Sequence, residues 1–290
     1  MKPIGYLLAI VTVTIWSSTF IVTKIILEYM SPVELLTYRM FLATLAMFLI
    51  YPKYQKPTSI KEESWYMLSG LALAAYFIFE NTAIDKTFPS NVGLLVALSP
   101  IVTTMLLSIR TKVSYFNKPR TIGLVLALIG VGLVVFGESG FEGFSPIGDL
   151  LAIGAAVSFS FYTIFLKEMK QENHIIQRTR KVFLYMFIYI LFFALFRGVD
   201  FNILHQSTSV ILGVVFLAIL ASSFAFIFWN KALEVLGTFE TSVFIYLIPV
   251  ITMIFSKIVL DDPITLLKVF GTVCIIVGLI FSEKKVQADA

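Results

Sequence analysis

The sequence predicts an all-α membrane protein whose ten transmembrane helices form two inverted five-helix repeats. The first observation behind this prediction is composition, because 58% of the 290 residues are hydrophobic and only 14% are charged. A soluble domain carries roughly 25% charged residues, so this chain has too little polar surface for water. The other two observations are the number of long apolar windows and a polar pattern that occurs in both halves of the chain.

Ten apolar windows are long enough to be transmembrane helices, which need about 20 mostly apolar residues to cross roughly 30 Å of hydrocarbon. The first window starts close to residue 1 and lacks a small-residue cleavage site, so we expect a retained span rather than a signal peptide. In chain order the windows are about 4–25, 33–51, 65–85, 90–109, 120–137, 147–166, 181–197, 209–230, 239–260 and 264–282.

The basic residues predict how these spans are oriented. Ten spans place both termini on one side of the membrane, and sixteen of the 22 Lys and Arg residues lie on that side. Cytoplasmic loops carry an excess of Lys and Arg, so we predict a multi-pass protein of the cytoplasmic (inner) membrane with both termini in the cytoplasm. The net charge of +4 is therefore a property of the loops and indicates no nucleic-acid partner.

Two stretches far apart in the chain share one polar outline. Residues 79–105 read FENTAIDKTFPSNVGLLVALSPIVTTM and residues 228–254 read FWNKALEVLGTFETSVFIYLIPVITMI. At an offset of 149, a Phe, an Asn, an Ala, a Pro and a Thr of the first stretch coincide with the same residue types in the second. The hexamers GYLLAI at 5–10 and GDLLAI at 148–153 match at an offset of 143.

These ordered matches divide the chain into an N-terminal five-helix repeat, residues 1–142, and a C-terminal five-helix repeat, residues 143–290. Five is an odd number, so the two halves must cross the membrane in opposite orientations. Inverted repeats of this kind are a transporter architecture in which the site lies near the bilayer midplane and one half rocks against the other. The sequence therefore favours alternating access around a central cavity.

Three motifs resemble a known transporter family. They are WSSTFIVTKIILEYMSPVELLTYRM at 16–40, PSNVGLLVALSPIVTTML at 89–106 and TSVFIYLIPVITMI at 241–254. The Trp-x-Ser-x-Phe opening and the two Pro-centred helices are similar to the ten-helix EamA-type branch of the drug/metabolite transporter (DMT) superfamily, over nearly the whole chain. The resemblance implies an exporter of small organic metabolites, such as amino acids or amine-like compounds, in a prokaryotic cytoplasmic membrane.

The chain departs from that family pattern at two places. The family often carries an acidic Gly-Glu turn after helices four and nine, whereas residues 109–116 read IRTKVSYF and only LDDP at 260–263 keeps acid. Glu80 also lies outside the common pattern, and we interpret it as a mark of this protein's own substrate chemistry.

Glu80 lies about 22 Å along the third window at 1.5 Å per residue, within the hydrocarbon zone. A carboxylate there is costly unless it is paired, hydrated or protonated, so it is a functional candidate. It could neutralise a substrate amine, carry a coupling proton, or form a structural ion pair with Lys24, Arg39 or Lys86. Arg39 in turn could hold a substrate carboxylate, snorkel outward or pair with Glu80. Proton antiport and uniport both remain open.

Aromatic rings with polar tips occur at the depth of the predicted cavity. Tryptophan usually lies at the membrane interface, so Trp16 near mid-membrane is informative. Such rings suit a mostly apolar pocket with a few oriented polar groups, and the alternative for each is packing against lipid or a neighbouring helix. The predicted substrate-binding residues are Trp16, Ser17, Tyr76, Glu80, Tyr162, Trp229 and Tyr246.

Prolines and amides inside the windows have predicted structural roles. Proline removes a backbone donor and kinks a helix, so Pro100 and Pro249 are predicted hinges. Asn81 and Asn230 are predicted to bond to neighbouring helices. Asn91, near the start of its window, is predicted to cap that helix.

Two glycine pairs have the spacing of a helix contact. Gly123 and Gly130 are seven residues apart, as are Gly271 and Gly278. That spacing puts each pair on one helix face, and small residues let helix backbones approach closely in a membrane. We therefore predict close packing at both pairs.

Motifs of other function classes are missing from the sequence. It contains no Gly-x-Ser-x-Gly elbow and no His-Glu-x-x-His, so we predict no enzyme, metal site or cofactor. The single Cys274 excludes an internal disulfide. Without a nucleotide-binding loop, we predict a secondary transporter whose partners are a small-molecule substrate, the lipid bilayer and, in antiport, protons. The sequence does not indicate an oligomeric state.

The alternative function is that of a non-transporting structural or accessory membrane protein. Such a protein would respond to substitution of its central polar residues by a change in assembly, never by a change in flux.

Overall fold

The chain forms a bundle of helices in a computed structural model that describes residues 2–53, 59–111, 118–136, 145–169, 175–199, 201–236, 241 and 243–282. Every regular element among these residues is helical. The predicted all-α membrane fold is confirmed, while the opposite orientation of the two halves stays a prediction.

The elements follow one another with short connections. In chain order they are α1 (Lys2–Ile26), α2 (Pro32–Ile50), α3 (Ile60–Lys86), α4 (Pro89–Val96), α5 (Ser99–Thr111), α6 (Lys118–Phe136), α7 (Pro146–Glu168), α8 (Ile175–Phe196), η2 (Ile203–His205), α9 (Thr208–Phe216), η3 (Leu217–Phe224), α10 (Ala225–Leu236), η4 (Val243–Tyr246), α12 (Leu247–Leu260) and α13 (Leu266–Ser282).

Within the described residues, seven stretches are long and apolar enough to cross a membrane. They are Lys2–Ile26, Pro32–Ile50, Ile60–Lys86, Pro89–Arg110, Pro146–Leu166, Ile175–Phe196 and Thr208–Leu236. Three shorter apolar helices, Thr121–Gly130, Phe244–Leu260 and Leu266–Gly278, coincide with the other three predicted windows.

Serines define where four of the helices begin. Each serine occupies the N-cap position, and its hydroxyl accepts a hydrogen bond from the backbone N–H three residues further on, which satisfies a donor that the helix leaves unpaired. These caps are Ser31, Ser59, Ser145 and Ser207. Pro32 and Pro146 follow two of them at the first helical position, where proline lacks only an N–H that has no partner in the helix.

Helix α8 is longer than its predicted window. It begins at Ile175 rather than near residue 181, because Arg178, Thr179 and Arg180 extend the apolar helix by polar turns that hydropathy alone does not detect. Helix α10 likewise continues past 230 to Leu236. These added turns form the walls of the larger of the two cavities described below.

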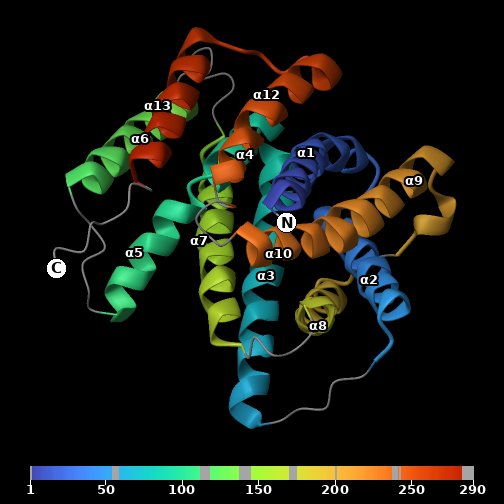
Figure 1. Ribbon diagram of the computed structural model, residues 1–290. Coiled ribbons are helices and arrows are strands. Elements are labelled where there is room, and N and C mark those ends of the chain that lie inside the picture. Colours follow the sequence, from blue (N-terminus) through green and yellow to red (C-terminus); the bar gives the residue numbers. More distant parts are fainter. Residues whose placement is uncertain are drawn as a thin grey trace.

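Three helix pairs organise the bundle (Figure 1). Helices α3 and α7 run side by side through its middle, α6 and α13 lie together at one edge, and α2 and α9 lie at the opposite edge. Helix α1 packs between α10 and α12 near the centre. Each of these contacts joins a helix of residues 1–142 to a helix of residues 143–290, so the two halves interleave.

Helices α6 and α13 contact one another through the predicted glycine pairs. A methyl group on Gly130 would lie 2.6 Å from the carbonyl oxygen of Gly271, and one on Gly278 would lie 2.5 Å from the carbonyl oxygen of Gly123. These separations are far below van der Waals contact, so no larger residue fits without moving the backbone. The predicted close packing is confirmed.

The two predicted prolines lie next to irregular turns, a break between α4 and α5 and a change from 3-10 to α-helix between η4 and α12. Helix α4 ends at Val96, and α5 restarts with Pro100 as its second residue. In the second half, η4 precedes α12, in which Pro249 is the third residue. Proline fits the first turn of a helix because that turn has no partner for its N–H. These irregular turns agree with the predicted interruptions, and hinge motion at them stays a prediction.

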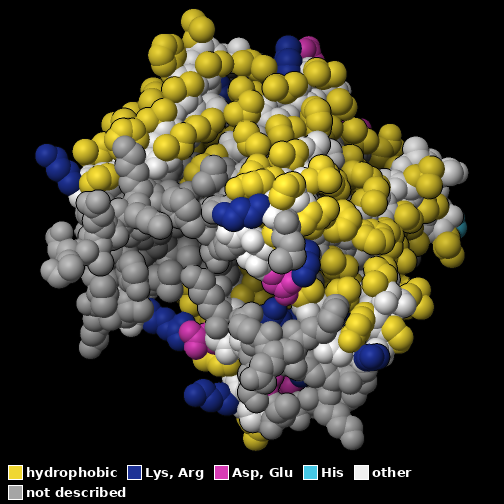
Figure 2. Space-filling model, in the orientation of Figure 1, with side chains coloured by type: hydrophobic (Ala, Val, Ile, Leu, Met, Phe, Trp, Pro, Cys, Tyr) yellow, Lys and Arg dark blue, Asp and Glu magenta, His cyan; other side chains and the backbone are white. Residues whose placement is uncertain are grey.

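The surface carries the apolar side chains expected of a lipid-facing protein. Figure 2 shows apolar atoms over most of the described part of one face. Large exposed side chains include Phe192 on α8, Ile258 on α12 and Phe270 on α13, with 63–74% of their area accessible. Large exposed apolar patches mark an interaction surface, and in a chain with these spans that surface is the bilayer.

Candidate functional site

A small central cavity of about 50 Å³ lies between the two halves of the chain. Its walls come from α1, α2, α3, α4 and α5 on one side, and from α7, α10, η4 and α12 on the other. The lining is mostly apolar with a few polar groups, which is typical of a small-molecule site.

Glu80 and Arg39 bring opposite charges to this cavity, and both are buried. A Glu80 carboxylate oxygen accepts a hydrogen bond from the hydroxyl of Tyr76, one turn earlier on α3. Arg39 Nε donates to Ser222 Oγ at 2.8 Å, and the guanidinium carbon lies 4.8 Å from the centre of the Phe77 ring. A guanidinium has five N–H donors and a carboxylate about four acceptor sites, so both groups keep capacity for a ligand.

The π-helical segment η3 anchors two of the cavity's polar side chains. Trp16 Nε1 donates to the carbonyl oxygen of Ala221 at 3.1 Å. Ser222, which accepts from Arg39, itself donates to the carbonyl oxygen of Leu217 at 2.9 Å. The wider turn of a π-helix exposes backbone oxygens that an α-helix would use, and such turns are frequent at functional sites.

Aromatic rings complete the wall of the cavity. The Trp16 ring centre lies 5.2 Å from those of Phe226 and Trp229, and the Phe159 ring centre lies 5.3 Å from that of Tyr76. Tilted pairs at these distances are favourable ring arrangements. An apolar or aromatic group of a ligand would therefore meet ring faces on several sides.

A second cavity of about 340 Å³, which we call the vestibule, lies beside the first. Its walls come from the second half of α7, the first turns of α8, the length of α10, and η4. Tyr162, Arg178, Trp229, Asn230 and Glu234 supply its polar and amphipathic lining. Three further residues, Phe159, Phe226 and Ile245, line both cavities, so the two spaces share a wall.

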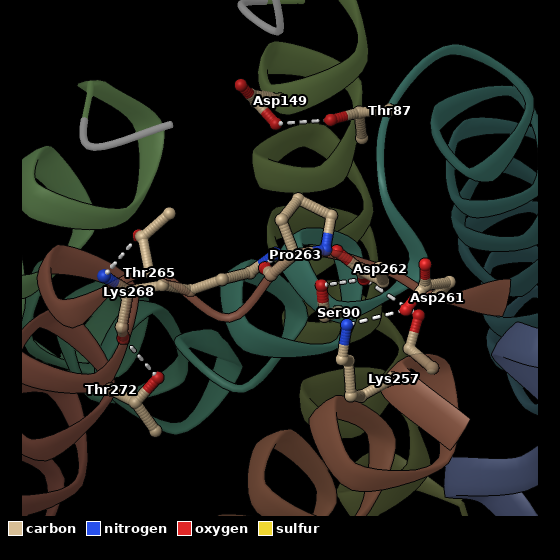
Figure 3. A network of polar contacts seen from close by, with 11 residues as sticks. Thr87, Ser90, Asp149, Lys257, Asp261, Asp262, Pro263, Thr265, Lys268 and Thr272 are labelled. Atoms are coloured by element: carbon tan, nitrogen blue, oxygen red, sulfur yellow. Dashed lines mark hydrogen bonds and ion pairs between the residues drawn. The ribbon is translucent and has the colours of Figure 1, made fainter. Parts of the chain in front are cut away.

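A buried polar network packs the end of the bundle where α3 stops and α4, α7 and α13 start (Figure 3). We call this the sealed end, formed by Thr87, Ser90, Asp149, Asp262 and Lys268. Lys268 Nζ lies 3.0 Å from Asp262 Oδ1, and only 1% and 2% of these two side chains are exposed. The other Asp262 oxygen accepts from the hydroxyls of Ser90 and Ser256.

The sealed end joins the two halves of the chain. Ser90 on α4 bonds to Asp262 after α12, and Thr87 Oγ1 donates to Asp149 Oδ1 on α7 at 3.2 Å. Outside the network, the exposed pair Lys257–Asp261 lies at 2.5 Å (Figure 3). Two adjacent aspartates of the LDDP sequence therefore have opposite environments.

The predicted site residues divide into three groups. Trp16, Tyr76, Glu80 and Arg39 line the central cavity, and Tyr162 and Trp229 line the vestibule. The remaining three lie outside both linings: Ser17 donates to the carbonyl oxygen of Val13, Tyr246 packs in the core, and Lys24 donates to the carbonyl oxygens of Ile84 and Asp85.

Several predicted roles of single residues are corrected by the structure. Arg39 is 2% exposed, so it does not snorkel outward. Asn91 is the third residue of α4, whose N-cap is Phe88, so the predicted cap is wrong. Asn230 Nδ2 does bond to a neighbouring helix, at Thr179 Oγ1 and 2.8 Å, whereas Asn81 Nδ2 donates to Phe77 of its own helix.

Sequence reasoning missed Phe159, Phe226, Ser222 and Arg178. The chain contains 28 phenylalanines, so no single ring stands out, and a π-helix has no evident sequence signature. Arg178 falls in the polar turns that precede the predicted seventh window. The described residues contain no group of three or more His, Cys, Asp or Glu that could hold a metal ion.

The arrangement of helices and cavity is that of a membrane transporter, and comparison with known sequences identifies the family. The EamA-like transporter family matches this chain twice, at residues 3–136 and at residues 146–283. The chain therefore belongs to the EamA-like transporter family. The predicted membership is confirmed.

Individual relatives are distant but match over most of their length. An uncharacterized transporter of Archaeoglobus fulgidus is 27% identical over 98% of this chain and 99% of its own. A protein of Escherichia coli named a probable amino-acid metabolite efflux pump is 24% identical, over 94% and 92%. A solved crystal structure aligns with a TM-score of 0.65 and 16% identity, over 97% and 98%, which shows a shared fold.

Proposed function

We propose that this transporter is a secondary exporter of small organic metabolites that works by alternating access. The observation that carries the proposal is the asymmetry around the central cavity. A vestibule adjoins the cavity towards one end of the bundle, while buried hydrogen bonds between the two halves pack the other end. A solute would enter at the first end and leave after the second end opens.

The vestibule faces the cytoplasm in this proposal. Its walls lie in the second half of α7, the first turns of α8 and the length of α10, towards the side where the excess of Lys and Arg predicts the cytoplasm. The sealed end then faces outward, in the cytoplasmic (inner) membrane of a prokaryote with both chain termini inside. In this proposal the arrangement of vestibule and sealed end is that of an inward-facing state, the state in which an exporter would load.

The moving parts in this proposal are the two halves, residues 1–142 and 143–290, in inverted orientation. The family model matches each half separately, which supports two homologous halves. The irregular turns just before Pro100 and Pro249 support the same interpretation. Such repeats rock about a site between them. These turns would act as the hinges, because a helix that is irregular near the cavity bends more easily than a regular one.

The proposed substrates carry an amine, a carboxylate, or both. Glu80 would accept an ammonium group and Arg39 would bind a carboxylate, with the apolar part of the solute against Trp16, Tyr76 and Phe226. The E. coli relative named an amino-acid metabolite efflux pump supports this class. Glu80 is also the proposed coupling group if protons drive export.

The test is transport by the purified protein in proteoliposomes. Counterflow of radiolabelled L-leucine and L-phenylalanine should exceed that of protein-free liposomes, and the same compounds should raise the melting midpoint of the protein in detergent. Putrescine is included to test amines without a carboxylate. Absence of both stabilisation and flux across amino acids and polyamines would favour the structural or accessory role.

A further inference from the structure

We propose that Ser17 and Ser160 are a matched pair of positioning residues, each holding the helical turn at a proline of the opposite half, and that their two contacts tighten in opposite states of the transport cycle. This inference rests on the proposed export by alternating access and adds the hydrogen bonds that exchange between the states. The two serines coincide at the repeat offset of 143, and the two prolines, Pro100 and Pro249, coincide at the offset of 149.

Both serine hydroxyls make a hydrogen bond from one half of the chain to the other. Ser17 Oγ on α1 donates to the carbonyl oxygen of Ile248 at 3.5 Å. Ser160 Oγ on α7 donates to the carbonyl oxygen of Ser99 at 2.9 Å. Each acceptor directly precedes one of the two predicted hinge prolines. The two bonds are therefore equivalent under the repeat, because each half makes the same bond to the other.

Each serine also has an acceptor in its own helix. Ser17 Oγ lies 2.7 Å from the carbonyl oxygen of Val13, and Ser160 Oγ lies 2.8 Å from that of Ala156. A serine hydroxyl has one O–H, so it serves two acceptors only by sharing that hydrogen or by alternating between them. Ser160 is close to both of its acceptors, whereas Ser17 is close only to the acceptor in its own helix. The two equivalent hydroxyls are therefore in different states.

Burial makes this arrangement suited to a contact that forms and breaks in every cycle. Both serine side chains are fully buried, so neither hydroxyl has water as an alternative partner. A buried donor without an acceptor is costly. The carbonyl oxygen one turn earlier in the same helix removes that cost, because the hydroxyl stays bonded there when it leaves the opposite half. Exchange between the two acceptors leaves no buried donor unpaired.

The two contacts lie at the wall of the central cavity. The acceptor residues Ser99 and Ile248 line this cavity, and so do Trp16 and Phe159, which precede the two serines in the sequence. The packing of α1 on α12 and of α7 on α5 brings each serine to the proline segment of the other half. A bound solute would touch both acceptor segments, so its binding would be coupled to the exchange of the two contacts.

The difference between the two distances assigns each contact to a state. Here the sealed end is packed, the Ser160 contact is short and the Ser17 contact is long. In inverted repeats that rock about a central site, the second state is reached when the two halves exchange their conformations. The Ser160 contact therefore stabilises the state in which the sealed end is packed, and the Ser17 contact stabilises the state in which that end is open.

The test measures how often the sealed end opens, by double electron–electron resonance between two spin labels. The single cysteine, Cys274, is replaced by alanine. Labels are placed on Asp85→Cys at the end of α3 and Lys257→Cys in the last turn of α12, two exposed positions in different halves. The full-length protein is measured in lipid nanodiscs without solute, and the ratio of long to short label distances is the open-to-closed ratio.

Ser160→Ala should raise the open-to-closed ratio about 2- to 10-fold, because it removes the contact that is short in the packed state. Ser17→Ala should lower the ratio by a similar factor. The double variant should return to within about twofold of the starting chain, since the two losses act on opposite states. The matched control is Ser18→Ala, whose hydroxyl donates to the carbonyl oxygen of Ile15 within α1. A bond present in both states shifts neither, so this ratio should also stay within about twofold.

The outcomes separate this inference from the function on which it rests. Shifts of Ser17→Ala and Ser160→Ala in the same direction, no shift in either, or one unchanged short distance in every chain would overturn the pair. Leucine counterflow through the native protein is measured in parallel. Opposite shifts without flux would support the pair and overturn the exporter proposal, whereas flux without opposite shifts would overturn the pair and leave the exporter proposal standing.

Discussion

A buried ion pair at the sealed end and two buried opposite charges in the central cavity differ in what surrounds them. Asp262 and Lys268 are enclosed by protein donors and acceptors: two serine hydroxyls reach Asp262, and the Pro263 carbonyl oxygen accepts from Lys268 at 3.3 Å. Glu80 and Arg39 are equally buried, but both face a space that no protein atom fills. Burial is similar in the two places, and Glu80 and Arg39 are the charges that border a cavity.

The difference separates charges that hold the structure from the charges that we propose bind the solute. A buried charge costs several kcal/mol to desolvate unless it is paired and hydrogen-bonded. The sealed end meets this cost within the protein, so opening that end must break bonds between the halves. The hydrogen bonds of Glu80 and Arg39 within the protein offset only part of this desolvation cost, and interactions with a charged solute would offset the remainder. Substitutions at the sealed end should therefore lower stability, whereas substitutions in the central cavity should lower affinity for the solute.

The largest effect is expected at the sealed end. Asp262→Ala removes one partner of a fully buried pair, and such losses destabilise proteins by about 3–5 kcal/mol. The melting midpoint in detergent should fall sharply. The control is the adjacent Asp261→Asn, which alters an exposed ion pair at a left-handed backbone position (φ 54°) that asparagine tolerates. Equal midpoints for the two variants would contradict the assignment of the sealed end.

The next largest effect is expected at Arg39. Arg39→Gln keeps a donor for Ser222 but removes the charge, and hydrogen bonds to charged groups contribute about 1.5–3 kcal/mol. Affinity for L-leucine should fall roughly 10- to 100-fold, while affinity for putrescine should not fall. Isothermal titration in detergent measures both. If leucine affinity matched that of the native protein, Arg39 would have no role in carboxylate binding.

A third substitution separates proton coupling from amine binding. Glu80→Gln keeps an acceptor for the Tyr76 hydroxyl but cannot carry a proton or a negative charge. We expect leucine counterflow to weaken by about tenfold, the loss of one interaction with a charged group. Acceleration of export by an imposed pH gradient should disappear. Proton-driven flux retained in this variant would remove Glu80 from the coupling mechanism.

The smallest effect is expected at Ser222, which touches Arg39 from η3. Ser222→Ala removes the hydrogen bond that it accepts from Arg39 and the one that it donates to the carbonyl oxygen of Leu217. The guanidinium charge proposed to bind the solute remains, so the KM for leucine should rise only a few-fold while kcat changes little. Ser90→Ala is the counterpart at the sealed end and should lower stability without changing KM. If Ser90→Ala raised the KM and Ser222→Ala lowered only the stability, the proposed difference between the sealed end and the central cavity would be wrong.

The sequence predicted the parts of the fold that depend on composition and spacing. Hydropathy located the spans, and the interval of seven between Gly123 and Gly130 predicted the contact with α13. Pro100 and Pro249 predicted the irregular turns beside them. These features follow from short-range physical rules: bilayer thickness, the period of a helix, and the missing N–H of proline.

The candidate site was predictable only in part. Whether a residue lines a cavity depends on the direction in which its side chain leaves the helix, and residue type does not determine that direction. Trp16 and Glu80 are unusual at their depth, so the pattern of the sequence identified them. Ser17 and Tyr246 have equally suitable chemistry but lie outside both cavities, and helix rotation is not encoded in the composition of a span that is apolar all round. Arg178 was missed because its polar turn lies outside the apolar window.

The π-helical segment Leu217–Phe224 makes the backbone hydrogen-bond pattern at this point as important as the side chains. A π turn holds one residue more than an α turn, so a regular α-helix through the same number of residues would rotate everything that follows by about 100° for each such turn. Phe226, Trp229 and Asn230 would then leave their walls together. A change from π to α hydrogen bonding here, with no side chain of either cavity altered, would dismantle both cavities at once.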